Sequence, residues 1–318
     1  MIHPDTSTRI PDRAKAAKKQ ASSPPAQDAT KIETDPMKSP LKRKPKPKPI
    51  TLKWFGWTDI GRVRKNNEDA FLGLRFDAHE VHRLGKIGDA SPAKHDFTFA
   101  VCDGMGGAKA GEYASQIAVD KITTLLPRAF HQSGSGLDAR VADVLAELYE
   151  QIHRALVYLG SSYDECHGMQ TTMSLCWFTP GWMYFGHVGD SRIYHLSAKK
   201  KEILQLTEDD THVGWLFRTG QINEREARTH PRRNVLQKAL GGGNQFVDPQ
   251  VGAVTCGRGD IFLLCSDGLT EGLYDHYLVD ILRASAKNGK INPAQLLVNE
   301  SVKNDGRDNT TALVVQVV

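Results

Sequence analysis

Short strand-like runs that follow one another along the chain constrain its fold most strongly. These runs are rich in Val, Ile, Phe, Trp or Tyr and have Gly, Asp or Pro at their ends, as is typical of β-strands. The predicted strands lie at residues 51–57, 70–74, 97–102, 172–178, 182–188, 191–196, 250–255, 261–265 and 312–318. Two long stretches, 113–126 and 137–159, repeat apolar residues every three or four positions and are predicted helices. Shorter helices are predicted at 278–286, at 293–303 and after Asn223, whose spacing to Glu226 fits a capping box.

The order of these elements indicates the fold class. Strands mostly follow strands, and helices come in pairs between them, which favours antiparallel sheets with helices packed outside over a doubly wound parallel fold. The chain has no internal repeat and no second apolar core, so we expect a single α+β domain over residues 51–318.

The first 50 residues have a different composition from the remainder. They hold 12 Lys or Arg against 5 Asp or Glu, 9 of the 15 prolines, and no Phe, Trp or Tyr. Such a segment cannot bury enough apolar surface to offset the entropy of ordering it, so we predict that residues 1–50 are a disordered basic tail. Two interpretations stay open: a docking arm for acidic partners, or a solubilising tail of no specific function.

Composition also bears on the compartment. No apolar stretch approaches the roughly 20 residues that span a bilayer, and the N-terminus has no apolar core of the secretory type. The five cysteines form no CxxC pair, and two of them sit in apolar runs as small hydrophobes. These features favour a reducing compartment, and we expect a cytoplasmic protein.

Three aspartates share one sequence context. Asp103 and Asp267 each follow an apolar run and precede Gly, and Asp308 lies just before the final predicted strand. Singly, an Asp-Gly after a strand is usually a plain turn. Three carboxylates at strand ends can instead converge, and hard oxygen ligands without a His/Cys cluster suit Mg²⁺ or Mn²⁺ rather than zinc.

An ordered set of motifs carries a family resemblance. The segment Asp59-Ile-Gly-Arg-Val-Arg-Lys-Asn-Asn-Glu-Asp69 is followed by V-C-D-G-M-G-G, G-D-S-R, C-S-D-G and D-N-T-T. This order resembles the metal-dependent protein phosphatases (PPM, type 2C) over the whole of 51–318. The resemblance implies two stacked antiparallel β-sheets flanked by pairs of α-helices. It also implies an enzyme that hydrolyses phosphoserine and phosphothreonine in proteins.

The resemblance assigns roles to particular residues. Asp103 looks like the carboxylate that bridges two metal ions, with the carbonyl of Gly104 as a further ligand. Asp267 and Asp308 resemble the other direct ligands. The remaining assignments are as follows: Glu68 and Asp69 as the acidic pair that holds metal-bound waters, Arg64 as the phosphate-binding arginine, and Asp190 as the ligand that shares a looser third ion with Asp267.

The implied chemistry needs no protein nucleophile. Two divalent ions, Mn²⁺ or Mg²⁺, would lower the pKa of a bridging water to about 7 and supply hydroxide for attack on phosphorus. Arg64 would hold two phosphate oxygens in a fork. Met105 stands where many eukaryotic members have a histidine, and a thioether cannot donate a proton, so a metal-bound water must protonate the leaving oxygen. Gln170 replaces a usual glycine and puts the local backbone geometry in question.

The sequence argues against two other functions. An inactive phosphoprotein-binding module usually lacks one of the carboxylates, and here all are present. A nucleic-acid adaptor is not supported, because no aromatic residue interleaves the basic residues of the tail. The Met105 variant has a bacterial character, and similar proteins often oppose a Hanks-type serine/threonine kinase. We therefore expect phosphorylated proteins as partners and a monomeric chain.

Arginines in the variable segment 206–241 either steer acidic substrates or are solvated surface charges; they are Arg218, Arg225, Arg228, Arg232 and Arg233.

Overall fold

The computed structural model describes residues 50–318 except 78, 107–109, 134–136 and 244–245. The predicted disordered tail therefore lies outside the described residues, apart from its last position. In the part that is described, no helix combines the length and the apolar character needed to cross a bilayer.

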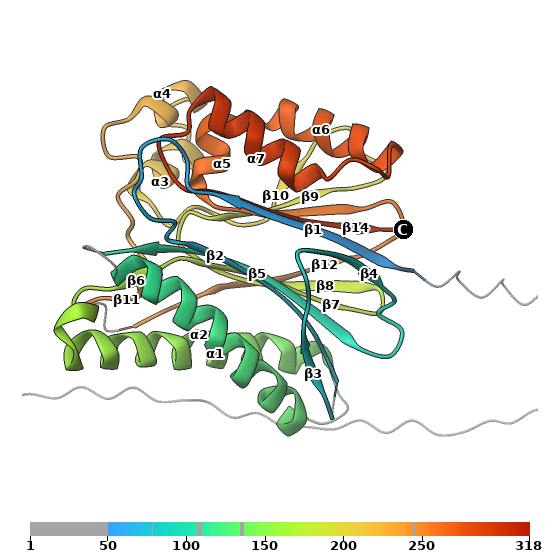
Figure 1. Cartoon of the computed structure of the whole chain (residues 1–318), viewed down its shortest axis with the longest axis horizontal. Helices are drawn as coiled ribbons and strands as arrows, with labels where there is room; N and C mark the ends of the chain where they lie inside the picture. The colour runs from blue at the N-terminus through green and yellow to red at the C-terminus, as the bar shows by residue number, and fades with distance from the viewer. Residues whose placement is uncertain (1–49, 78, 107–109, 134–136, 244–245) are drawn as a thin grey trace, which may run out of the picture. The chain divides into compact units, whose positions relative to one another are not determined.

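Two antiparallel sheets form the centre of the fold (Figure 1). Within the described residues one sheet has six strands and the other has eight. The six-stranded sheet has the spatial order β10 (Leu204–Gln205), β9 (Arg192–Leu196), β13 (Ile261–Cys265), β14 (Thr310–Val317), β1 (Leu52–Asp59) and β4 (Ile87–Ala90). The eight-stranded sheet has the order β11 (Leu240–Gly241), β6 (Gln170–Thr171), β5 (Asp96–Met105), β7 (Met173–Thr179), β8 (Trp182–Val188) and β12 (Gln250–Thr255). In that sheet β2 (Asp69–Phe76) also pairs with β5 and with β3 (Val81–Arg83).

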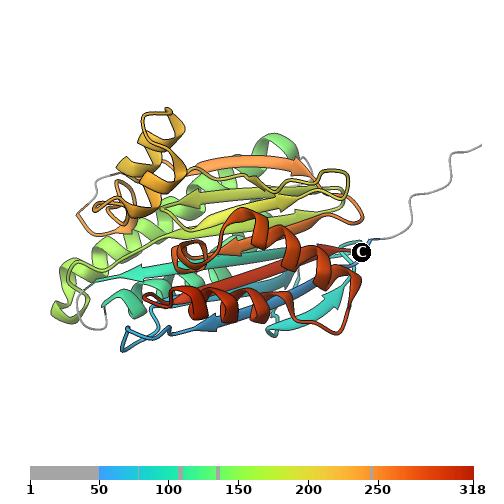
Figure 2. The same ribbon diagram turned by 90° about the horizontal axis from the view of Figure 1, so that it is seen from above.

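Helices cover the outer faces of both sheets. The two long helices α1 (Ala110–Ser133) and α2 (Leu137–Ser162) cover the eight-stranded sheet, while α5 (Asp267–Gly272), α6 (Asp275–Lys287) and α7 (Pro293–Asn304) lie over the six-stranded sheet (Figures 1 and 2). Two short helices, α3 (His212–Arg218) and α4 (Glu224–Thr229), follow β10, and a 3₁₀ turn spans Asp164–Cys166. Asn223 caps α4 in the predicted capping box with Glu226. The predicted class, two stacked antiparallel sheets flanked by helices, is confirmed.

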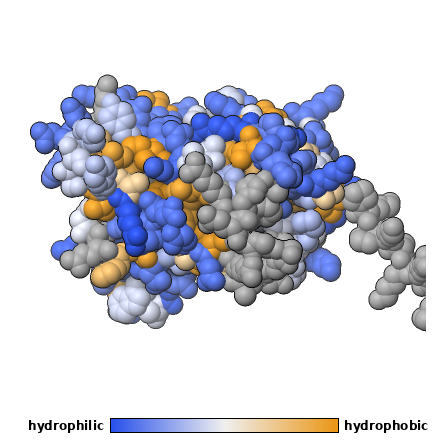
Figure 3. Space-filling view, turned by 90° about the horizontal axis from the view of Figure 1, so that it is seen from below, coloured by the Kyte–Doolittle hydropathy of each residue, from blue (hydrophilic) through white to orange (hydrophobic). Residues whose placement is uncertain are grey.

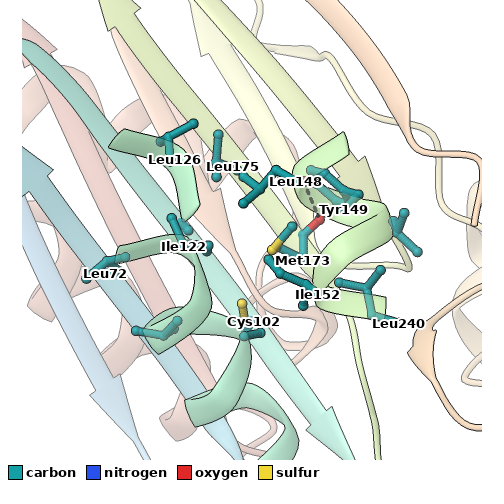
Figure 4. Packing of buried hydrophobic residues seen from close by; sticks show 14 of the residues in the cluster. Leu72, Cys102, Ile122, Leu126, Leu148, Tyr149, Ile152, Met173, Leu175 and Leu240 are labelled. Atoms are coloured by element: carbon teal, nitrogen blue, oxygen red, sulfur yellow. Dashed lines mark hydrogen bonds between the residues drawn. The ribbon is translucent and has the colours of Figure 1, made fainter. Parts of the chain in front are cut away.

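Three apolar layers hold these elements together. Between the sheets, Phe178 of β7 meets Phe262 of β13 edge to face, with ring centroids 5.3 Å apart. Under α1 and α2, the buried Tyr149 donates its hydroxyl to the Met173 carbonyl at 3.1 Å (Figure 4). A third cluster joins α5, α6 and α7 to the six-stranded sheet. Figure 3 views the side of α1 and α2, where apolar patches lie between hydrophilic residues. Because burial of apolar area is the main favourable term in folding, these layers fix how the strand ends meet.

The structure corrects two local expectations. Asp103 was expected to follow its strand in a turn, but it lies inside β5, which continues to Met105. The strand continues because Gly104 and Met105 pair with Thr171 and Gln170 of β6. Asp267 likewise opens helix α5 rather than a plain turn.

Candidate metal centre

The acidic residues lie where strands of the two sheets begin or end. Asp69 and Asp103 face each other across the β2–β5 ladder. Asp267 follows the end of β13 and Asp308 precedes the start of β14, and these strands are antiparallel neighbours. Asp267 and Asp308 therefore lie at the same end of these two central strands of the six-stranded sheet.

Ser266 joins the two sheets at this end of the strands. Its hydroxyl donates to Asp69 Oδ2 at 2.7 Å and accepts the Thr311 N–H at 3.0 Å. The Ser266 side chain is fully buried, so this polar link is shielded from water. It ties Asp69, from the eight-stranded sheet, to the sheet that carries Asp267 and Asp308. Ser266 was not singled out from the sequence, although it precedes Asp267 in the C-S-D-G motif.

The clustered carboxylates disfavour one another's ionisation. Burial, and then the charges of Asp69 and Asp267, raise the pKa of Asp103 well above its usual range. Burial, and then the charge of Asp190, raise the pKa of Asp267 in the same way. Burial raises the pKa of Asp69 to about 6, although hydrogen bonds from Thr311 and Ser266 oppose this shift. Like charges held close in a partly buried site favour protonation unless a cation neutralises them.

Two buried carboxylate oxygens indicate whether the site suits a cation. Asp69 Oδ1 and Asp267 Oδ1 are shielded from solvent, and neither has a hydrogen-bond partner among the described residues. A buried anionic oxygen without a donor is costly, and buried charges normally pair or coordinate a metal. All the donors are hard oxygen atoms, as Mg²⁺ and Mn²⁺ prefer. These residues therefore fit a divalent cation.

Gly104 and Glu68 border the same cluster. The Gly104 N–H donates to the Glu68 carbonyl at 3.1 Å, and a Cβ on Gly104 would lie 2.0 Å from the Gly111 carbonyl oxygen. Position 104 therefore requires glycine, because the first turn of α1 packs directly against it. The carboxylate of Glu68 lies against Gly111, and burial raises the pKa of Glu68.

Arg64 lies against two of these carboxylates. Its Nη2 donates to Asp308 Oδ2 at 2.6 Å, and its Nη1 is 3.8 Å from Glu68 Oε2. The hydrogen bond to Asp308 is the main cause that raises the pKa of Arg64. The side chain is 47 % exposed, so a phosphate can reach the guanidinium from solvent.

Asp190 lies in a loop held by the segment that follows β10. The Gly189 N–H donates to Asp210 Oδ2 at 3.0 Å, and Arg192 holds Asp209 through two of its nitrogens, Nε and Nη2. Burial, and then the charge of Asp209, raise the pKa of Asp190 to about 7. The ordered loop keeps Asp190 within electrostatic reach of Asp267.

His187, in β8, has a structural role. It is buried, with Nδ1 2.9 Å from Ser174 Oγ and Nε2 3.0 Å from the Gly189 carbonyl oxygen. Both ring nitrogens are therefore engaged.

A cleft of about 480 Å³ opens beside Asp190 and Asp267, between α3, α4 and α5. Three arginines of the variable segment 206–241 line it, but each is already engaged. Arg218 lies 3.1 Å from Glu208, and Arg233 lies 3.0 Å from Glu271. Arg228 pairs with Glu224, donates to two carbonyls of the α5 region and stacks on Tyr274 at 3.9 Å. These contacts favour a structural role for the three arginines over substrate steering.

A second polar group lies at the opposite end of β2. Asp77, Glu80 and His95 have side-chain ligand atoms within 4.8 Å of one another. Asp77 Oδ1 accepts the His79 and Glu80 N–H groups, and the two oxygens of Glu80 meet Arg75 and His82. These partners satisfy the carboxylates, so the group stabilises the β2–β3 hairpin.

The sequence of this chain matches a known family. The family model of protein phosphatase 2C matches residues 88–297. Antiparallel sheets stacked face to face, with an acidic cluster at their strand ends, agree with this match. The chain belongs to the protein phosphatase 2C family, in its bacterial form.

Named relatives and solved structures agree with this assignment. The serine/threonine phosphatase stp of Listeria monocytogenes is 33 % identical over 81 % of this chain and 93 % of its own length. The serine/threonine protein phosphatase PstP of Mycobacterium tuberculosis is 30 % identical over 85 % of this chain and 46 % of its own. The structure of the Staphylococcus aureus phosphatase Stp1 has a TM-score of 0.69 and 28 % identity, and covers 84 % of this chain and 95 % of that one. The chain is therefore a member of an enzyme family of serine/threonine phosphatases.

Proposed function

We propose that this chain hydrolyses phosphoserine and phosphothreonine in proteins at a centre of two divalent ions, Mn²⁺ or Mg²⁺. The observation that carries the proposal is the cluster of carboxylates that raise one another's pKa, with two buried oxygens that have no donor in the described part of the chain. A structure of the PstP catalytic domain, 27 % identical to this chain with a TM-score of 0.63, is described as a complex with 2 manganese ions.

Each acidic residue has a proposed place in this centre. Asp103 would be shared between the two ions, because it lies within reach of the charges of Asp69, Asp267, Asp190 and Asp308. Asp267 and Asp308 would complete one site. The other proposed ligands are the Gly104 carbonyl, Glu68 and Asp69 on the two-ion centre, and Asp190 with Asp267 on a weaker third site.

When bound, the ions would supply Lewis acidity that activates water and neutralises charge on the phosphoryl group. Arg64 would bind two phosphate oxygens with its planar guanidinium, which approaches the cluster from the solvent side. Ser266 keeps Asp69 in place by hydrogen bonding to it. Met105 cannot donate a proton, so the side chain at this position takes no part in protonating the leaving oxygen.

We further infer that residues 51–318 form the catalytic domain and that residues 1–50 are an appended basic tail. A cytoplasmic location, a monomeric state and opposition to a Hanks-type serine/threonine kinase complete the proposal. Support for them comes from the composition of the chain and from the resemblance of its motifs, not from contacts in the structure.

Hydrolysis of p-nitrophenyl phosphate and of matched phosphothreonine, phosphoserine and phosphotyrosine peptides tests the proposal. We expect activity with Mn²⁺ or Mg²⁺, a preference for the first two peptides, and loss of activity in EDTA that added metal restores. Asp248→Asn removes a 94 % exposed carboxylate and is the matched control for substitutions in the centre. Turnover that persists after exhaustive chelation would overturn the metal-dependent mechanism.

A further inference from the structure

The loop that carries Arg64 has no regular secondary structure to hold it. It runs from the end of β1 at Asp59 to the start of β2 at Asp69, and Val63 within it is 68 % exposed. The contact between Arg64 and Asp308 joins a long, half-exposed side chain to one carboxylate. Because such a side chain has many rotamers, the backbone of the loop must be fixed for the guanidinium to stay at the site.

One buried side chain fixes both sides of this loop. Asn309 is 3 % exposed, and its Nδ2 donates to the Ile60 carbonyl at 2.9 Å and to the Asn66 carbonyl at 3.0 Å. Its Oδ1 accepts the Glu68 N–H at 2.8 Å. Both amide donors and the carbonyl are therefore used, and their partners precede and follow Arg64 in the chain.

Asn309 is itself held firmly against the metal centre. Its backbone N–H donates to Asp308 Oδ1 at 2.8 Å, the same carboxylate that Arg64 contacts through Oδ2. A Cβ on Gly268 would lie 2.1 Å from the Asn309 carbonyl oxygen, so the first turn of α5 packs directly on this backbone. Asn309 thus sets the distance between the Arg64 loop and the carboxylate cluster.

We propose that Asn309 is a positioning residue, which orients Arg64 for phosphate binding through the backbone of loop 60–68. The inference rests on the proposed function only for the role of Arg64. The remaining anchors of the loop do not replace the amide. Arg62 donates its N–H to the Gly306 carbonyl at 2.7 Å before Arg64. After Arg64, Asn67 Nδ2 donates to Thr58 Oγ1 at 2.8 Å, and the Glu68 carbonyl accepts the Gly104 N–H at 3.1 Å. Asn309 differs from these anchors because its one side chain contacts the loop on both sides of Arg64.

Asn309→Ala is the first test. The substitution removes three hydrogen bonds to the loop, yet it keeps the backbone N–H that Asp308 accepts. We expect KM for p-nitrophenyl phosphate to rise by about tenfold, with a smaller change in kcat, because a displaced Arg64 weakens phosphate binding. Asn309→Ser, whose hydroxyl can replace one donor, should lose less.

A double-mutant cycle with Arg64→Ala separates positioning from general stability. If Asn309 acts through Arg64, Asn309→Ala should change KM by less than about twofold once Arg64 is gone. Asn292→Ala is the matched control, because Asn292 caps α7 by accepting the Gln295 N–H at 3.1 Å, away from the Arg64 loop. It should lower Tm without changing KM.

Hydrogen exchange supplies a readout that does not need activity. Amides in peptides that cover residues 60–68 should exchange faster in Asn309→Ala, while those of β14 keep their protection. The positioning role is overturned if the effects of Asn309→Ala and Arg64→Ala on KM are additive, or if amide exchange in residues 60–68 is unchanged. Failure of both Asn309 variants to fold overturns it as well. An inactive wild-type protein would instead refute the proposed function, and the exchange result would still decide how the loop is held.

Discussion

The substitution Asp69→Asn should stabilise the metal-free protein, although it removes a residue of the proposed active centre. Asp69 is 5 % exposed, and burial followed by the opposing hydrogen bonds of Thr311 and Ser266 leaves its pKa at about 6 rather than 3.8. Asparagine has nearly the same shape and can still accept the Ser266 hydroxyl, but it carries no charge to desolvate.

The size of the effect follows from the pKa. A carboxyl group whose pKa is higher in the folded state than in the unfolded state destabilises the fold when it ionises. The shift from 3.8 to about 6 corresponds to about 3 kcal/mol at most. Because Asp69 and its neighbours share protons, we expect a gain of about 1–3 kcal/mol, or about 2–6 °C in Tm.

The pH dependence gives the sign of the effect. Below about pH 3 Asp69 is protonated in both states, so the variant and the wild type should have equal stability. The advantage of the variant should grow as pH rises from about 3 to 6, where the unfolded state ionises first, and should be constant above about pH 7. Urea unfolding in EDTA at pH 4, 5, 6 and 7.5 measures this curve, with Asp248→Asn as the exposed control.

Metal should offset the stability advantage of the variant. Wild-type protein at a metal concentration of 100 times Kd gains about 2.7 kcal/mol per ion. Loss of a residue that orients metal-bound groups lowers metal affinity by about 10–100-fold, so at the same metal concentration the variant loses about 1.3–2.3 kcal/mol of that gain. A variant that is less stable than wild type in EDTA at pH 7.5 would refute the electrostatic reasoning, since it would show that the charge of Asp69 is compensated within the protein.

Three further predictions concern activity. Asp103→Asn should reduce turnover by several orders of magnitude with the fold intact, and a variant that keeps more than about a tenth of wild-type kcat would contradict its bridging role. Arg64→Ala should lower kcat/KM by about 10–150-fold, mainly through KM, since a charge-assisted hydrogen bond contributes about 1.5–3 kcal/mol; a change below about twofold would make it a loop charge. A chain that begins at Pro49 should keep its kcat on a small aryl phosphate, and loss of that activity would show that the predicted boundary is misplaced.

Long, buried elements were the predictable part of the fold. The strands β5, β7 and β14 are buried along nearly their whole length, and the sequence shows this as mostly apolar runs with few polar residues. The strands that were missed, β3, β4, β6, β10 and β11, have two to four residues each. Elements this short show no periodicity, and their pairing partners decide their conformation.

The candidate centre was predictable in its acidic residues but not in its supporting contacts. Asp103, Asp267 and Asp308 each stand in a motif beside a strand, and the structure brings them within electrostatic reach of one another. Their roles as ligands stay predictions. Asn309 stands in the same D-N-T-T motif as Asp308, yet the loop it binds lies 241 or more positions away. No local pattern encodes such a contact, because it exists only after β1 and β14 have paired.

Gln170 shows how the fold accommodates a departure from the family pattern. The glutamine stands where family members usually have glycine, so added bulk beside Asp103 was a concern. In the structure Gln170 keeps its place in β6, paired with Met105 on one side and with Gly241 on the other. A Cβ on Gly242 would lie 2.2 Å from Gln170 Nε2, and Gly242 has a positive φ of 66°. The glycine at 242 therefore leaves the space that the glutamine side chain fills, and the β5–β6 pairing beside Asp103 remains intact.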